Sequence, residues 1–456
     1  MCFISGQRGP FMSQIIRSRK PLSGMSSLVR GTVILTGAAI LTRFMGFFFR
    51  IFLSRAFQEE GMGLYQLVFP VYGVVLSVTA AGIQTALSRM VAAHTALHQD
   101  GEARVCLGAA LILSGGLSLG ATVAVQQNAA WIAGRFLGNP DCAGLLTVLS
   151  WAFPPASVHS CICGYYLGKK GTRIPAQSQL LEQTIRILSV WGFYSARDAL
   201  AFPEPVTAAV LGLVCGELAA AFYSIFSLRR AVAASGRLSR LVPAGIRLIR
   251  LSAPLSATRL LLSLLQSVEA ASIPLCLQQS ALTASEALSV YGTFSGMALP
   301  CILFPSALTG SVSTMLVPEV AQIQAARSRR ELKPLIIRVC STCFLFGIFC
   351  MLGFFILGNW IGRFLFHSPE AGQFILTLSF ICPFLYTNGT LTSILNGLGK
   401  TGTTFLISAL SLGIRIGGVF FLIPRFSIQG YLWGLLASQL FTSAVTLFAA
   451  FRAVQD

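Results

Sequence analysis

The sequence predicts an all-α polytopic membrane protein, with about twelve transmembrane helices in two parallel six-helix lobes. Three observations support this fold class. The chain has 456 residues, of which 54% are hydrophobic and 11% charged, whereas about a quarter of residues are charged in soluble domains. Apolar stretches follow one another almost without pause. A phrase in the first half of the chain also returns in the second half.

Each apolar stretch is long enough to cross a hydrocarbon core of about 30 Å as a helix. The predicted spans cover approximately residues 31–54, 64–92, 104–125, 142–167, 175–194, 206–228, 251–277, 290–318, 335–357, 372–397, 402–422 and 428–450. Six fall in each half of the chain.

The repeated phrase indicates an internal duplication. Residues 167–172 return as 398–403 with five of six residues identical, and flanking residues recur at an offset of 229, so that Arg186 faces Arg415. An even number of crossings returns the chain to its starting side, so we expect parallel repeats related by an axis along the membrane normal. The working site is then expected between the two halves.

The repeat divides the chain into four predicted segments. Residues 1–30 form a basic, disordered, cytoplasmic segment, in which we find no signal peptide. Met25 is an alternative start. Residues 31–230 form the N-lobe, 231–250 a basic cytoplasmic linker, and 251–456 the C-lobe.

The net charge of +18 reflects topology. Of the 33 lysines and arginines, 23 lie on the face shared by both predicted termini, 5 on the other face and 5 within spans. The positive-inside rule therefore places both termini in the cytoplasm. Anionic lipid headgroups, rather than nucleic acid, are the partners expected for these charges.

Motifs for catalysis or metal binding are not evident. Gly399-Lys400-Thr401 lacks the earlier glycine of a phosphate-binding loop, since position 394 is isoleucine, and is better explained as a tight cytoplasmic turn. The 12 cysteines lie mostly inside predicted spans, as expected for small packing residues. We therefore expect no enzyme, cofactor or metal site.

Five arginines fall inside predicted spans, where a charge normally faces a bundle interior or a water-filled cavity. Arg43 and Arg50 lie seven residues apart on the first helix and so share one face. Arg259 lies on the equivalent seventh helix. We predict that these three surround one central cavity and bind an anion, because guanidinium groups grip phosphate oxygens bidentately.

The other two arginines are Arg186 and Arg415. Glu182 precedes Arg186 by one helical turn, which predicts a structural ion pair. Glu269 is too far from Arg259 along the helix for direct pairing. Glu269, Glu217 and Asn388 are further candidates for the cavity or for ion coupling.

Several motifs resemble a known family. Residues 42–50 (TRFMGFFFR), 63–70 (GLYQLVFP), 254–259 (PLSATR) and 285–292 (SEALSVYG) are similar to the stage V sporulation protein B branch of polysaccharide transporters. This branch belongs to the multidrug/oligosaccharidyl-lipid/polysaccharide (MOP) exporter superfamily, with its MATE-like fold, and is related to lipid II flippases. The resemblance covers about residues 25–450.

The resemblance implies a protein of the bacterial plasma membrane with two six-helix lobes that alternate between inward-open and outward-open states. In the related flippases, arginines on the first helix serve the central cavity, and Arg43 and Arg50 match that pattern. Arg259 matches the sporulation branch alone. Many relatives have fourteen helices, the last two holding the carrier lipid, whereas this chain ends after the twelfth predicted span.

The leading hypothesis is a monomeric flippase for a polyprenyl-diphosphate-linked saccharide, such as a peptidoglycan precursor. A role in spore cortex formation, cell-wall enzymes as partners, and coupling to Na⁺, H⁺ or the membrane potential are possible extensions. The alternative is a MATE-type antiporter for organic cations, which the arginine-lined first helix disfavours. A non-transporting scaffold for a cell-wall complex is a third hypothesis.

Overall fold

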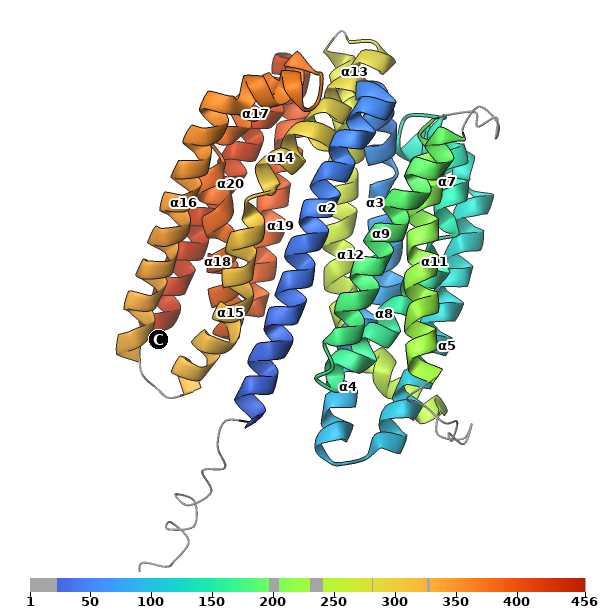
Figure 1. Cartoon of the computed structure of the whole chain (residues 1–456). Coiled ribbons are helices and arrows are strands. Elements are labelled where there is room, and N and C mark those ends of the chain that lie inside the picture. The colour runs from blue at the N-terminus through green and yellow to red at the C-terminus, as the bar shows by residue number, and fades with distance from the viewer. Residues whose placement is uncertain (1–22, 197–204, 230–240, 281, 326–328, 456) are drawn as a thin grey trace, which may run out of the picture.

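The computed structural model describes residues 23–196, 205–229, 241–280, 282–325 and 329–455. Within these ranges the chain is almost entirely helical and contains no strand, which confirms the all-α prediction. Two groups of helices stand side by side and meet at one end (Figure 1).

The first group is formed by the N-terminal half. Its elements are α2 (Ser23–Leu67), α3 (Phe69–Leu76), η1 (Ser77–Ala81), α4 (Gly82–Ala96), α5 (Asp100–Gln127), α6 (Ala129–Trp131), η2 (Ile132–Phe136), α7 (Cys142–Ser150), α8 (Phe153–Gly168), α9 (Arg173–Ser195) and α11 (Thr207–Arg229).

The second group is formed by the C-terminal half. Its elements are α12 (Leu241–Gln279), α13 (Ala284–Tyr291), η4 (Gly292–Ala298), α14 (Leu299–Leu303), α15 (Ser306–Ala325), α16 (Arg329–Phe364), α17 (Pro369–Ser379), α18 (Cys382–Gly397), α19 (Thr401–Gly417), η5 (Gly418–Leu422) and α20 (Ile423–Gln455).

Six helices in the described part of the chain are long and apolar enough to cross a membrane, or up to nine if each of three bent pairs is one span. Two of the six cover two predicted spans each, Val33–Ala96 and Thr401–Ala453. Both are broken by a residue outside helical geometry, Gln58 in α2 and Ser427 in α20. The total of about twelve stays a prediction.

The duplication is visible in three dimensions. After α8, the backbone amides of residues 169, 170 and 171 donate hydrogen bonds to the carbonyls of residues 165, 167 and 166, respectively. The same three hydrogen bonds follow α18, with every residue number larger by 229. A methyl group at Gly168 would lie 2.7 Å from the carbonyl oxygen of Ser88, and one at Gly397 would lie 2.9 Å from that of Val317, a pair with the same offset. The helices before the two turns are thus related by an offset of 229 residues. The repeated phrase has an offset of 231, because it begins at residue 167 in the first turn and at residue 398 in the second.

Two predicted boundary segments differ from the expectation. Residues 23–30 of the predicted disordered segment are the first turns of α2, and 241–250 of the predicted linker are the first turns of α12. Each stretch continues without a break into a long apolar helix. Pro243 is tolerated because it lies in the first turn of α12, where backbone amides have no partner within the helix. Residues 1–22 and 230–240 lie outside the described part.

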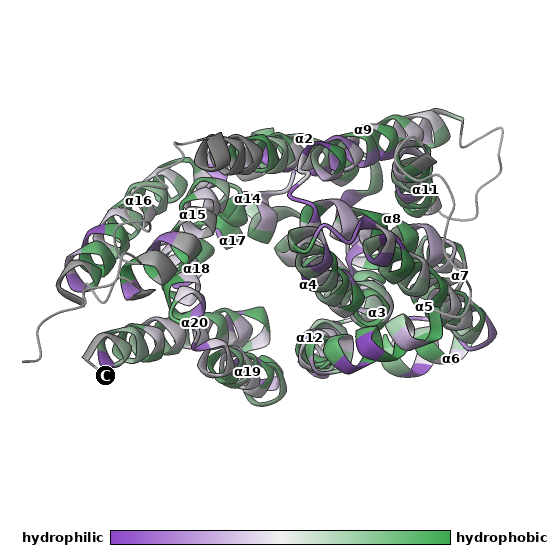
Figure 2. Cartoon of the chain, turned by 90° about the horizontal axis from the view of Figure 1, so that it is seen from below, coloured by the Kyte–Doolittle hydropathy of each residue, from purple (hydrophilic) through white to green (hydrophobic). Residues whose placement is uncertain are grey.

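α12 joins the two groups. It packs on α3, α4 and α5 of the N-terminal half and on α13, α19 and α20 of the C-terminal half. In the view along the helices it stands between α3 and α19 (Figure 2). Large apolar side chains cover the outside of the bundle, among them Phe349 and Ile356 of α16 and Phe421 of η5. Such a surface is suited to lipid.

Candidate functional site

A cavity of about 410 Å³ lies where the two groups of helices meet. Its walls come from α2, α3 and α12, from α13, η4 and α14, and from α19 and α20. Its polar lining residues are Arg50, Gln66, Ser263, Gln266, Ser267, Glu269, Tyr291, Ser295, Arg415 and Tyr431. Both halves of the duplicated chain therefore contribute to it, as the repeat predicted.

Two donors that α2 contributes to this cavity have no partner among the residues that the structure describes, and the buried Ser295 hydroxyl of η4 has none there either. The Nη1 atom of Arg50 and the Nε2 atom of Gln66 are both buried without a hydrogen bond. An unsatisfied buried donor costs about 1–3 kcal/mol, and more when it is charged. Both donors come from α2, and both residues line the central cavity. They favour a ligand rich in acceptor oxygens.

The opposite wall carries an ion pair. Arg415 of α19 approaches Glu269 of α12, with 2.6 Å between Nε and Oε1. The hydroxyl of Tyr431 on α20 donates to the same carboxylate oxygen at 2.9 Å. Glu269 is 3% exposed, so its charge is compensated within the protein rather than by solvent.

Arg43 lies next to this cavity. An adjoining space of about 390 Å³ is lined by Arg43 and Arg50 and shares Pro300 and Leu303 with the central cavity. Arg43 itself is exposed. A methyl group at Gly310 of α15 would lie 3.6 Å from its Nη1. The structure therefore brings Arg43 and Arg50 to one continuous wall, as their spacing predicted.

Arg259 is not among the residues that line these spaces. It is exposed on α12, one turn before Ser263 and two turns before Gln266, which both line the central cavity. It lies on the same helix face, beyond the end of the cavity. Its part in binding stays a prediction.

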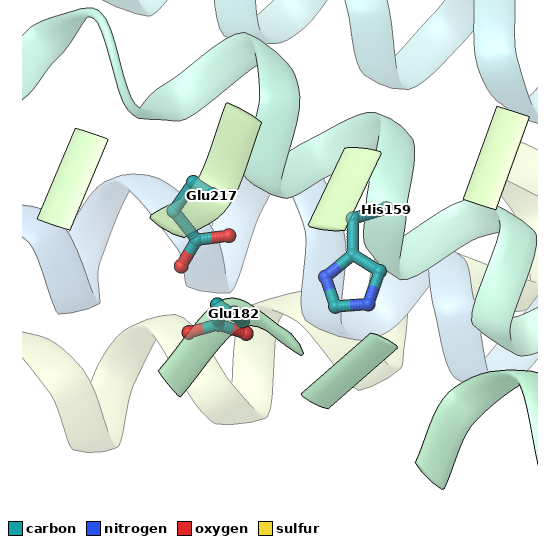
Figure 3. A group of neighbouring side chains, drawn as sticks. All are labelled: His159, Glu182 and Glu217. Atoms are coloured by element: carbon teal, nitrogen blue, oxygen red, sulfur yellow. The ribbon is translucent and has the colours of Figure 1, made fainter. Parts of the chain in front are cut away.

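Glu217 does not line the central cavity either. It is 6% exposed and lies inside the N-terminal group, where the Tyr72 hydroxyl donates to it at 2.7 Å. Arg186 contacts both Glu182, as predicted, and Glu217, the latter at 3.6 Å. Figure 3 shows Glu217 and Glu182 facing each other, with the ring of His159 beside them.

Asn388 is buried in the C-terminal group, between α18 and α20. Its Nδ2 donates to the side-chain oxygen of Gln439 at 2.8 Å, and its Oδ1 accepts from Ser443 at 2.6 Å. These bonds fix two helices of one group to each other. Asn388 is therefore a structural contact in this conformation and not part of the central cavity wall.

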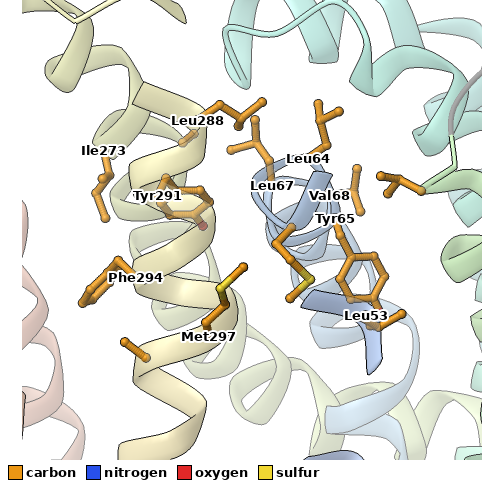
Figure 4. Close-up of a cluster of buried hydrophobic side chains, with 14 of the residues drawn as sticks. Leu53, Leu64, Tyr65, Leu67, Val68, Ile273, Leu288, Tyr291, Phe294 and Met297 are labelled. Atoms are coloured by element: carbon orange, nitrogen blue, oxygen red, sulfur yellow. The ribbon is translucent and has the colours of Figure 1, made fainter. Parts of the chain in front are cut away.

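The two groups meet at the end of the bundle that holds α13. The C-terminal part of α2 packs there on α13 and η4, and apolar side chains from both sides form one cluster (Figure 4). A methyl group at Gly292 of η4 would lie 2.9 Å from the Cα of Gly63. Arg55 of α2 donates to the carbonyls of Phe364 and Leu365, at 2.9 Å each. We call these contacts the interlobe seal.

The comparisons with known proteins agree with this geometry. Residues 28–324 match the polysaccharide biosynthesis protein family. The chain belongs to this family. Stage V sporulation protein B of Bacillus subtilis (strain 168) is 26% identical over 405 residues, which are 88% of this chain and 78% of that protein.

Solved structures show the fold. An inward-facing multidrug resistance MATE family transporter of the MOP superfamily has a TM-score of 0.72 at 13% identity, over 93% of this chain and 98% of that one. The lipid II flippase MurJ in an inward closed conformation has a TM-score of 0.68 at 13% identity, over 93% and 89%. The protein thus has the MATE/MOP fold and is a multi-pass membrane protein. The two solved structures that share this fold are a multidrug transporter and a lipid II flippase.

Proposed function

We propose that this protein is a flippase that carries a polyprenyl-diphosphate-linked saccharide across the bacterial plasma membrane by alternating access. The supporting observation is that two donors, Arg50 Nη1 and Gln66 Nε2, have no partner among the described residues. Both residues line a cavity to which the two lobes contribute. A diphosphate supplies the acceptor oxygens and the negative charge that these donors lack.

The charge of the cavity supports an anionic substrate. Among the described residues that line the cavity, Glu269 is the one acidic side chain, and Arg415 compensates it. Arg50 is then left as a net positive charge, and Arg43 adds a second at the adjoining wall. A cation antiporter needs an uncompensated carboxylate in this place, so the MATE-type alternative is disfavoured.

The conformation also fits a transport cycle. The positive-inside rule places the Lys169 and Lys400 turns in the cytoplasm, because they join predicted spans on the basic face. The interlobe seal then lies at the outer end of the bundle. Diphosphate enters the cavity from the inside in this state, and opening of the seal exposes it to the outside.

Reconstitution tests the proposal directly. The purified protein is placed in liposomes with fluorescent polyprenyl-diphosphate-linked saccharides, and outer-leaflet appearance is scored with a membrane-impermeant quencher. We expect flipping by the native protein and a loss of at least about ten-fold in Arg50→Gln, which removes one charge-assisted contact of about 1.5–3 kcal/mol.

Arg89→Gln is the matched control, because Arg89 is an arginine of α4 that does not line the central cavity. Equal flipping by Arg50→Gln and the native protein contradicts the assignment of the cavity. A protein that moves organic cations but no lipid-linked saccharide supports the antiporter instead. The choice of saccharide in the assay, with peptidoglycan precursors first, identifies the natural cargo.

A further inference from the structure

The duplication places a partly buried arginine at the same position in each lobe. Arg186 of α9 and Arg415 of α19 are separated by the same offset that relates the helices. Each contacts a buried glutamate that also accepts a hydrogen bond from a tyrosine: Glu217 with Tyr72, and Glu269 with Tyr431. The two lobes therefore contain Arg-Glu-Tyr clusters of the same composition, in which the arginines occupy equivalent positions of the repeat and the glutamates and tyrosines do not.

The charge of the two clusters differs. In the C-lobe, one arginine faces one glutamate. In the N-lobe, Arg186 faces two, because Glu182 takes a position whose counterpart in the C-lobe is Ser411. With both carboxylates ionised, the N-lobe cluster has one surplus negative charge, buried among helices. Such a charge is expensive unless something positive joins it.

The neighbours of the surplus charge are also titratable. His159 has Asn388 as its counterpart at the repeat offset, and its Nε2 is 2.9 Å from the Ser178 hydroxyl. Ligand-type atoms of His159, Glu182 and Glu217 all lie within 4.8 Å of one another. In the C-lobe, Asn388 meets the neutral amide of Gln439 on the last helix of that lobe. At two equivalent positions the N-lobe therefore has a titratable side chain, His159 or Glu182, where the C-lobe has a neutral one, Asn388 or Ser411.

We propose that this N-lobe cluster binds one exchangeable proton, carried by Glu217 with His159 as its neighbouring acceptor, and that this is the proton that drives the transport cycle. The second part rests on the proposed flippase function. Glu217 is the carrier because Glu182 makes the closer contact with Arg186, which leaves Glu217 with a 3.6 Å contact and the deeper position.

A proton suits the cluster better than a metal ion. Arg186 already approaches both carboxylates, and its guanidinium repels any cation placed between them. A proton needs no such space, since it resides on a single carboxylate oxygen. Two close carboxylates sharing one proton is a recurring solution to this repulsion.

α3 connects the N-lobe cluster to the central cavity. Tyr72 donates to Glu217, while Phe69, Pro70 and Gly73 of the same short helix line the central cavity. Protonation of Glu217 changes the acceptor that holds Tyr72 and so biases the position of α3. The charged and titratable groups that face Glu217 are Tyr72 from α3, His159 and Cys163 from α8, and Glu182 and Arg186 from α9.

Infrared difference spectroscopy of the purified protein tests proton binding without any cargo. A pH titration in nanodiscs records the carbonyl-stretch band of protonated carboxylic acids. We expect a band in the native protein that disappears in Glu217→Gln, a substitution that still accepts the Tyr72 hydrogen bond. His159→Asn, which copies the C-lobe residue, should shift the titration of the band. Glu269→Gln is the matched control and should retain it.

Flipping assays test the coupling. A gradient of about one pH unit changes the distribution of cargo about ten-fold if one proton is exchanged per cycle. We expect this response in the native protein and its loss in Glu217→Gln, with cargo binding retained.

An unchanged infrared band in Glu217→Gln overturns the proton site, whether or not the protein is a flippase. A Glu217-dependent band without any effect of the gradient on flipping overturns the coupling. Failure to flip any lipid-linked saccharide contradicts the proposed function, while the infrared result still decides the proton site. Size-exclusion profiles of each variant confirm that the comparison is made on folded protein.

Discussion

The interlobe seal depends on a position that admits no side chain, and Gly292→Ala tests it. A methyl group there would overlap the carbonyl oxygen of Glu59 and the amide nitrogen of Gly63, and would lie 2.9 Å from the Gly63 Cα. Ordinary carbon contacts are about 3.5–4.0 Å. The two lobes must therefore separate by about 1 Å at this point, and the opposing atoms belong to the backbone, which cannot rotate away.

Overpacking of this kind costs about 1–3 kcal/mol. The cost falls on the sealed conformation alone, because an open seal separates Gly292 from Gly63. The ratio of outward-open to sealed protein should then rise roughly 5–150-fold. Size-exclusion profiles and membrane yield check that neither lobe changes internally.

Access to the cavity from outside measures this ratio. Ser263 lines the central cavity, so Ser263→Cys gives a thiol that a membrane-impermeant maleimide on intact cells reaches through an open seal. The chain without Ser263→Cys gives the background from native cysteines. Gly353→Ala is the control, because a methyl group there meets nothing within 4 Å. Equal labelling rates in the Gly292→Ala and Gly353→Ala backgrounds would refute this account of the seal.

Three further predictions follow from described contacts. Arg55→Ala removes two hydrogen bonds across the seal and should raise the same labelling rate at least roughly 5-fold, since each bond contributes about 0.5–1.5 kcal/mol; no rise would mean that these bonds do not hold the lobes together. Arg415→Met leaves Glu269 without its charge partner and should lower the free energy of unfolding by about 3–5 kcal/mol. The double variant Arg415→Met/Glu269→Leu should recover most of this loss in thermal unfolding, and a double variant as unstable as the single one would argue against the pair. Gly168→Ala and Gly397→Ala each push a methyl group against a backbone carbonyl and should lower the free energy of unfolding by similar amounts, about 1–3 kcal/mol each. Gly413→Ala, with open space around it, should melt like the native chain, and a large difference between the first two variants would contradict their structural equivalence.

The fold class was predictable because it depends on local properties of the chain. Apolar length predicts helices that suit a membrane, and the constant offset between the two copies predicts two related lobes. The Glu182 contact of Arg186 follows from spacing on one helix. The common wall of Arg43 and Arg50 follows in the same way, since seven residues return a helix to the same face.

The remaining contacts of the candidate site were not predictable from spacing. Glu269 and Arg415 are 146 positions apart in sequence, and their contact depends on how α12 packs on α19. Glu217 was a candidate for the central cavity, yet it faces the interior of its own lobe. One signal was available in the sequence: because Arg186 and Arg415 are equivalent, a glutamate partner for the first implied a partner for the second.

The position of α12 has a consequence for biosynthesis. This helix belongs by sequence to the second half of the duplicated chain, yet it packs on α3, α4 and α5 of the first half. The contact is close, since a methyl group at Gly82 would lie 2.8 Å from the backbone nitrogen of Ser256. Chains leave the ribosome from the N-terminus, so the first half is inserted while one side of its bundle still lacks its covering helix. The N-terminal half completes its packing only when α12 is inserted. Its folding therefore depends on synthesis of the first helix of the C-terminal half.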